Sequence, residues 1–207
     1  MINGVWGKKI GMTQVFSEDH KVIPVTVIDV SDWLITQIKT QENAGYNAVQ
    51  VGYLRKKYKG QDFSAQWLKD LNKYFSVVKE VGLLNETHEL QIGQVADVGQ
   101  LLAQGDNVDI SGITIGRGFQ GVMHRHGHSG GRGSHGDKLG RAPGSLSFTR
   151  SQGRVFKGRR LPGHMGVAKR VMRNLKVVKI EPTSQVLLIK GSVPGKSGSL
   201  VFVKKCR

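Results

Sequence analysis

The sequence predicts a mainly β protein, in which one β-barrel carries a small helical insertion and a long, irregular, basic extension. Three observations lead to this prediction. Short runs of β-branched and aromatic residues recur toward both ends of the 207-residue chain. One stretch with a helical spacing of apolar residues interrupts the first group of runs. Between the two groups lies a segment rich in glycine and positive charge that follows neither period.

Strands are expected wherever β-branched and aromatic residues gather between polar or Gly-containing turns. The expected strands cover residues 12–16, 21–30, 33–40, 48–53, 88–92, 107–115, 171–181, 185–190 and 199–204. Residues 17–20 are expected to connect the first two strands as a hairpin. Because strands lie on both sides of the basic segment, residues 1–115 and 174–207 are expected to form one barrel, which residues 116–173 interrupt.

The helical insertion is expected at about residues 60–86. Trp67, Leu71 and Phe75 recur every four residues, which places their side chains on one helical face. Ser64 precedes them as the expected N-cap. Since large apolar side chains at this spacing usually form core, these residues are expected to pack rather than to bind a partner.

Positive charge is concentrated in Gly116–Arg173, which we call the basic segment. It holds 13 of the 31 Lys and Arg residues, five of the seven His, half of the 28 glycines, and a single acidic residue, Asp137. Residues 1–115 hold 11 basic and 13 acidic side chains. A surface built only for solubility mixes both signs of charge. The exclusion of acids therefore predicts a dense, fixed negative partner, for which a nucleic acid backbone is the leading candidate.

Residues 117–160 are not expected to fold without that partner. They contain few large apolar side chains and no sustained secondary-structure period. Ordering a backbone costs about 1–2 kcal/mol per residue, and too little apolar surface is present to offset this cost. The abundant glycines would let the backbone approach phosphates and sugars closely.

Three other interpretations of the basic segment stay open. Residues 116–121 match the G-x-G-x-x-G pattern of dinucleotide-binding sites, although the following residues break the helical pattern that such a site needs. A nucleoid-type DNA-binding protein would also be basic. A metal-dependent enzyme would use a cluster of four histidines and one aspartate: His124, His126, His128, His135 and Asp137.

The rest of the composition excludes several classes of protein. Cys206 is the only cysteine, so neither a disulfide nor a Cys-based zinc site can be built within the chain. No apolar run approaches the length of about 18 residues that a membrane span requires, so no membrane partner is expected. The first residues leave no room for a signal peptide, which predicts a cytoplasmic protein. No cofactor and no small-molecule substrate are expected.

Six blocks, in order, carry a resemblance to a known family. They read GKKIGMT (7–13), GRGFQG (116–121), RAPGSL (141–146), GRVFKG (153–158), PGHMG (162–166) and LLIKGSVPG (187–195). By these blocks the chain resembles the ribosomal protein L-three family of the large subunit. The resemblance implies a non-enzymatic structural protein with a translation-protein-type β-barrel. It also implies an early role in subunit assembly and an extension that threads through large-subunit rRNA toward the peptidyl transferase region.

The resemblance further implies partners and a location. The partners would be large-subunit rRNA near its 3′ end and the neighbouring ribosomal proteins L-fourteen and L-nineteen. The length suggests a bacterial or an organelle-encoded member, so the ribosome would be cytoplasmic or organellar. Some bacterial members carry a methylated glutamine between the third and fourth blocks. A gapless alignment places Arg150 there, with Gln152 two residues on, which puts that modification in doubt here.

The candidate rRNA contacts are basic and histidine side chains of the basic segment together with two lysines of the first block. They are Lys8, Lys9, Arg117, His124, Arg125, His126, Arg132, Lys138, Arg141, Arg150, Arg154, Lys157, Arg159, Arg160, His164, Lys169, Arg170 and Arg173. Lys and Arg would neutralise phosphates, while imidazole rings would stack on bases or bond 2′-hydroxyls.

Overall fold

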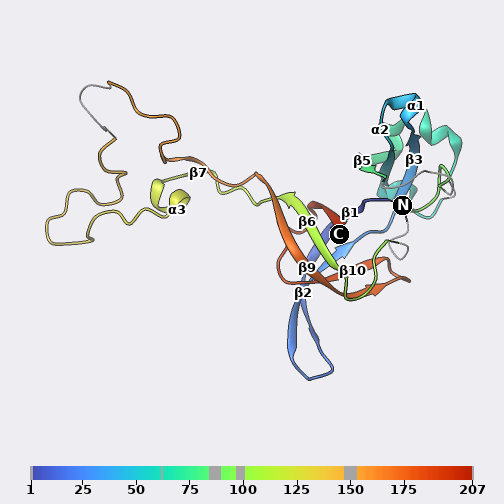
Figure 1. Cartoon of the computed structure of the whole chain (residues 1–207), viewed down its shortest axis with the longest axis horizontal. Helices are drawn as coiled ribbons and strands as arrows, with labels where there is room; N and C mark the ends of the chain where they lie inside the picture. Colours follow the sequence, from blue (N-terminus) through green and yellow to red (C-terminus); the bar gives the residue numbers. More distant parts are fainter. Residues whose placement is uncertain (1, 62, 84–89, 97–100, 147–152, 207) are drawn as a thin grey trace. The chain divides into compact units, whose positions relative to one another are not determined.

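The computed structural model describes residues 2–61, 63–83, 90–96, 101–146 and 153–206. The chain divides into two compact units, which Figure 1 shows as ribbons. We call the first unit the body; it comprises Met1–Ile113 and Lys169–Arg207. We call the second unit the extension; it comprises Thr114–Ala168.

Six strands of the body close a barrel in the order β1, β11, β6, β9, β10, β2. Neighbouring strands are antiparallel throughout. The long β1 closes the ring, because its first half pairs with β11 and its second half with β2. The strands are β1 (Gly4–Phe16), β2 (Val22–Asp29), β6 (Asn107–Ile113), β9 (Lys169–Glu181), β10 (Val186–Lys190) and β11 (Leu200–Lys205). The predicted mainly β fold with a barrel is confirmed.

Alternating side chains of these strands fill the barrel interior. The period of two in a strand sends every second residue inward. The short apolar runs of the sequence were therefore sufficient to predict a barrel core. Burial of each such aliphatic side chain contributes about 1.5–3 kcal/mol. Fully buried members of this core are Ile28, Val108, Ile110, Val177, Leu187, Ile189, Val201 and Val203.

A second sheet of the body has the order β3 (Trp33–Lys39), β4 (Ala48–Leu54), β5 (Phe75–Gly82). Strand β5 lies inside the stretch that the sequence assigned to a helical insertion. Its register against β4 runs from Ala48 opposite Gly82 to Leu54 opposite Phe75. The β-branched residues of β5 favour this pairing. The helical spacing of apolar residues just before β5 did not reveal the strand.

The helical part of the insertion is short and broken. The expected N-cap is confirmed, since the Ser64 hydroxyl accepts a hydrogen bond of 3.4 Å from Gln66 N. Trp67 and Phe75 pack in one apolar cluster as expected, although a single helix does not connect them. The body has four short helical segments among its described residues: α1 (Gln41–Ala44), η1 (Lys56–Tyr58), η2 (Ala65–Leu68) and α2 (Leu71–Tyr74).

Three other local expectations have clear outcomes. The hairpin at residues 17–20 is confirmed, because Ser17 N donates to Lys21 O over 2.9 Å. The expected strand at 88–92 begins outside the described residues, and its described part, 90–92, forms no strand. Strand β9 begins at Lys169, within the predicted basic segment, because Lys169 pairs with Ile113 at the end of β6.

Candidate nucleic-acid interface

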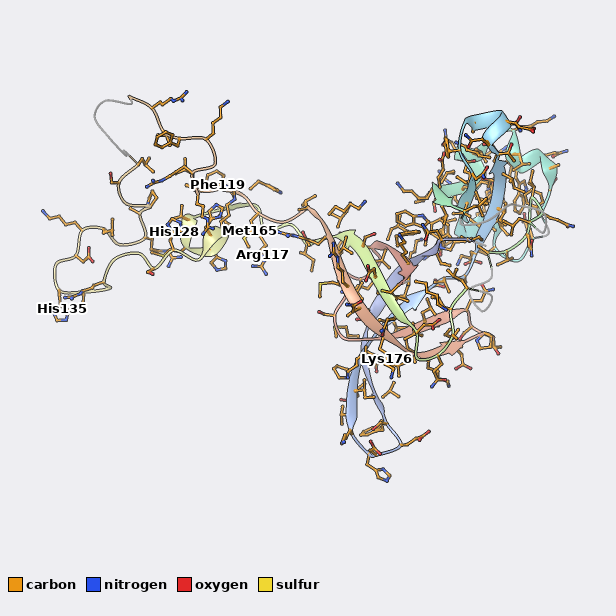
Figure 2. The ribbon with its side chains drawn as sticks, viewed as in Figure 1. Arg117, Phe119, His128, His135, Met165 and Lys176 are labelled. Atoms are coloured by element: carbon orange, nitrogen blue, oxygen red, sulfur yellow. The ribbon has the colours of Figure 1, made fainter. Side chains whose placement is uncertain are left out.

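The outgoing and returning arms of the extension are joined by backbone hydrogen bonds. Thr114 N donates to Ala168 O over 3.0 Å, and Arg117 N donates to Met165 O over 2.9 Å. The ladder continues into a pair of two-residue strands, β7 (Phe119–Gln120) and β8 (Gly163–His164). The side chains of Arg117, Phe119 and Met165 are labelled there in Figure 2. This ladder fixes the register of the two arms.

Gly166 is required in this ladder. Its φ is +83°, and a Cβ at this position would come 2.1 Å from Ile115 O on the opposite arm. No other residue type meets both conditions without moving the backbone, because a side chain strains this conformation and also strikes the facing carbonyl.

We expect Gly166→Ala to loosen the ladder and leave the barrel intact. The strain of a side chain at positive φ costs about 1–2 kcal/mol, and Gly166 is not part of the barrel core. In the chain bound to large-subunit rRNA, hydrogen exchange of the Arg117 and Met165 amides should accelerate, while that of the barrel strands stays unchanged. Gly121→Ala is the matched control, because its φ is −68° and no atom lies within 4 Å of an added Cβ. Equal exchange in both variants would contradict this role of Gly166.

A one-turn helix, α3 (Val122–His126), follows the outgoing arm. The expectation that these residues break any helical pattern is therefore wrong. A single turn bounded by Gly121 and Gly127 is too short to show an apolar period in sequence. From this turn, Arg125 Nη1 lies 2.8 Å and His126 Nε2 3.1 Å from Leu161 O, which ties the turn to the returning arm.

The only acidic residue of the extension closes its far loop. The Asp137 carboxylate accepts backbone hydrogen bonds from Leu139 N, over 2.7 Å, and from Arg132 N. These hydrogen bonds lower the pKa of Asp137 below its ordinary value. Gly131 N also donates to Gly140 O over 2.8 Å and completes the loop. Asp137 is thus held by the backbone of its own loop, which explains how one acid is accommodated in an otherwise basic segment.

Nearly all candidate contact residues in the extension are exposed. Arg125 and His126 are half-buried through their contacts with Leu161, and Arg150 lies outside the described residues. No ion pair joins described residues of the extension to one another. The exposed candidates are Arg117, His124, Arg132, Lys138, Arg141, Arg154, Lys157, Arg159, Arg160 and His164.

The extension has almost no apolar core. Of its described residues, only Val122 is buried, at 1% exposure. Phe119 on the outgoing arm is 76% exposed, and Val167 on the returning arm is 60% exposed. Sequence reasoning did not select Phe119 as a functional residue. The signal was present, because a large aromatic side chain in a segment without a core has few neighbours to pack against.

The candidate residues outside the extension have different surroundings. Lys9 Nζ donates to Val193 O and Gly195 O over 2.8 and 2.9 Å, and so supports a turn of the body. Lys8 Nζ lies 3.5 Å from the centroid of the Tyr53 ring. Both side chains thus contact the protein itself. The three at the start of β9 are exposed: Lys169, Arg170 and Arg173.

The structure offers little support for the other interpretations. Residues 116–121 precede a helix of only five residues, and the described strands pair antiparallel, whereas a dinucleotide site needs a parallel βαβ unit. Within the described ranges, no three His, Cys, Asp or Glu side chains are grouped to hold a metal ion. None of the described helices has the length and apolar character to cross a membrane.

Comparison with known proteins gives consistent matches over the chain. Residues 70–186 match the family model described as Ribosomal protein L3. A protein of Alkaliphilus metalliredigens, named Large ribosomal subunit protein uL3, is 44% identical, with 97% of this chain and 96% of that protein covered. Proteins with the same name in Geobacillus thermodenitrificans and Syntrophus aciditrophicus are 43% and 42% identical. They cover 99% and 96% of this chain, and 96% and 91% of their own lengths are matched.

The fold and these matches define the class first: the chain is a ribosomal protein. Within this class, the chain belongs to the ribosomal protein L3 family. The resemblance read from the six sequence blocks is thereby confirmed.

Proposed function

We propose that the chain binds large-subunit rRNA through its extension. The observation that carries this proposal is that the exposed charged side chains of the extension are almost all positive. Every described Lys and Arg side chain of residues 114–168 is exposed except Arg125, which is half-buried. The one acid, Asp137, is occupied by backbone amides. A surface with this polarity repels itself in the free protein and is neutralised by closely packed phosphates.

The binding mechanism follows from the missing core. With a single buried residue among those that the structure describes, the extension lacks the apolar burial that stabilises an ordered loop of this length. Phosphate contacts and release of counterions would supply this free energy as RNA and protein assemble. Exposed rings such as Phe119 add surface on which unpaired bases stack. The extension is therefore ordered and bound in one coupled step.

The finer assignments rest on the family. We propose that the extension reaches toward the peptidyl transferase region, that the protein acts early in subunit assembly, and that its neighbours include ribosomal proteins L-fourteen and L-nineteen. Its place is the ribosome of the cytoplasm, or of an organelle if the gene is organellar. The body also offers a surface of suitable chemistry for a protein neighbour, since Met12, Phe16 and Val22 of the β1–β2 hairpin are more than half exposed.

Cosedimentation tests the proposal directly. Tagged full-length chain, expressed in bacterial cells, should migrate with the large subunit through a sucrose gradient at high salt. Contacts made during assembly hold a ribosomal component in the subunit at salt concentrations where purely electrostatic binding of free proteins is lost. The purified chain should also bind large-subunit rRNA more tightly than duplex DNA of equal length. Release from the subunit at high salt, or equal affinity for DNA, would favour the nucleoid-type alternative.

A further inference from the structure

A second cluster of basic side chains lies in the body, and none of its residues is among the candidate rRNA contacts of the extension, β1 and β9. Residues 55–74 hold six Lys and Arg residues and two acidic ones, whereas residues 1–54 hold four and five. The cluster is built on the short helical segments η1, η2 and α2, the last of which is labelled in Figure 1.

Three aromatic rings hold these segments together. The Tyr58 ring of η1 lies 4.9 Å from the Tyr74 ring of α2 and 6.2 Å from the Trp67 ring of η2, between centroids. Trp67 and Tyr74 are stacked at 5.6 Å. Trp67 is buried, whereas Tyr58 and Tyr74 are half-buried and keep part of their rings at the surface. The lysines that flank these rings are therefore confined to one small region.

Two basic residues of this stretch have structural roles. Arg55 Nε donates to Phe75 O over 3.2 Å and Arg55 Nη2 to Asn72 O over 2.8 Å, which fixes both ends of α2 against the chain after β4. Lys59 pairs with Asp32, and this hydrogen bond raises the pKa of its ammonium group. These contacts give both residues a structural role in holding the segments of the site in place.

Four other lysines are differently placed. Lys56, Lys57, Lys69 and Lys73 are exposed, and none forms an ion pair with another described residue. Lys57 Nζ lies 6.0 Å from the Tyr58 centroid, and Lys73 Nζ lies 5.3 Å from the Tyr74 centroid. Two acids belong to the same stretch, Asp62 and Asp70, and Asp70 forms no ion pair with another described residue. An ordinary solvated surface mixes both signs of charge more evenly.

We infer that these four lysines, with the rings of Tyr58 and Tyr74, form a second RNA-binding site on the body. Ammonium groups bind phosphates as point charges, and adjacent half-exposed tyrosine rings accept an unpaired base by stacking. The ligand class is thus an irregular or single-stranded RNA segment. The inference rests on the proposed rRNA function for the identity of the polyanion, but its residues are independent of the extension.

The test compares four variants of the full-length chain in filter binding to large-subunit rRNA over a salt series, three of which remove charge. The first carries Lys56→Gln, Lys57→Gln, Lys69→Gln and Lys73→Gln. Its matched control, the barrel control, changes to Gln four exposed lysines on the barrel strands and the turn between β10 and β11. None of them forms an ion pair with another described residue; they are Lys176, Lys190, Lys196 and Lys204. The third changes Arg154, Lys157, Arg159 and Arg160 of the extension to Ala.

The first variant should bind about tenfold more weakly, and its salt slope should be smaller in magnitude by about 3, since each phosphate contact contributes about 0.7–0.9. The barrel control should bind as wild type. Replacement of the same four lysines by Arg should restore affinity, which separates loss of charge from misfolding. Ultraviolet crosslinking should yield an RNA adduct on the peptide that contains Tyr58.

The outcomes separate the two proposals. Wild-type affinity of the first variant, or an equal loss in the barrel control, would overturn the second site alone. Wild-type affinity of the extension variant would instead count against the proposed function of the extension.

Discussion

Replacing Arg154, Lys157, Arg159 and Arg160 by alanine should reduce incorporation of the chain into large subunits by about tenfold or more in competition with wild type. All four side chains are exposed on the returning arm of the extension, and their replacement removes four positive charges. Each lost phosphate contact also loses its counterion release, and the bound extension becomes harder to order. Arg159 adds a second effect, since its Nη2 donates to Ser145 O within the extension.

The same variant should melt as wild type does. Exposed charge substitutions usually change stability by less than about 0.5 kcal/mol each, and the barrel core contains none of these residues. The measurement therefore pairs a thermal melt with a competition for incorporation in cells that express both forms. A variant that melts normally and competes equally would show that this stretch is not a principal rRNA contact.

Affinity for large-subunit rRNA should depend steeply on salt. If about six to ten basic residues of the extension meet phosphates, a log-log plot of affinity against salt concentration should have a slope of about −4 to −9. Between 50 and 200 mM salt, slopes of about −4 to −9 correspond to a loss of affinity of about 10²-fold to 10⁵-fold.

A titration by filter binding measures this slope. Removal of residues 119–164, with the two arms rejoined by a short glycine linker, provides the control that isolates the extension, because the barrel strands and their register lie outside this deletion. The deleted form should lose most of the slope. A full-length slope near zero would leave the concentration of charge without a function.

The local pattern of the sequence was enough to predict most of the body. Alternating residues such as Val108 and Ile110 point to one face of a strand wherever that strand lies, so the barrel strands followed from short-range periodicity. The hairpin at Ser17 and the N-cap at Ser64 depend on neighbours a few residues away. The separation of charge between body and extension is a property of composition alone.

Hydrogen-bond partners distant in sequence were decided only by the tertiary structure. Strand β5 exists because β4 offers it a paired edge, so the expected helix stops after α2. Lys9 was expected to face RNA, but it donates to carbonyls more than 180 residues away.

The candidate binding residues also differ in whether the sequence or the tertiary structure determines them. Exposure of the arginines in the extension follows from having no apolar surface nearby, which composition already shows. The placement of Lys57 and Lys73 beside two packed tyrosine rings does not follow from composition, because ring packing between η1 and α2 creates it. Charge and periodicity are properties of the chain itself, whereas such a site depends on which distant segments pack together and on which lysines form no ion pair with another described residue.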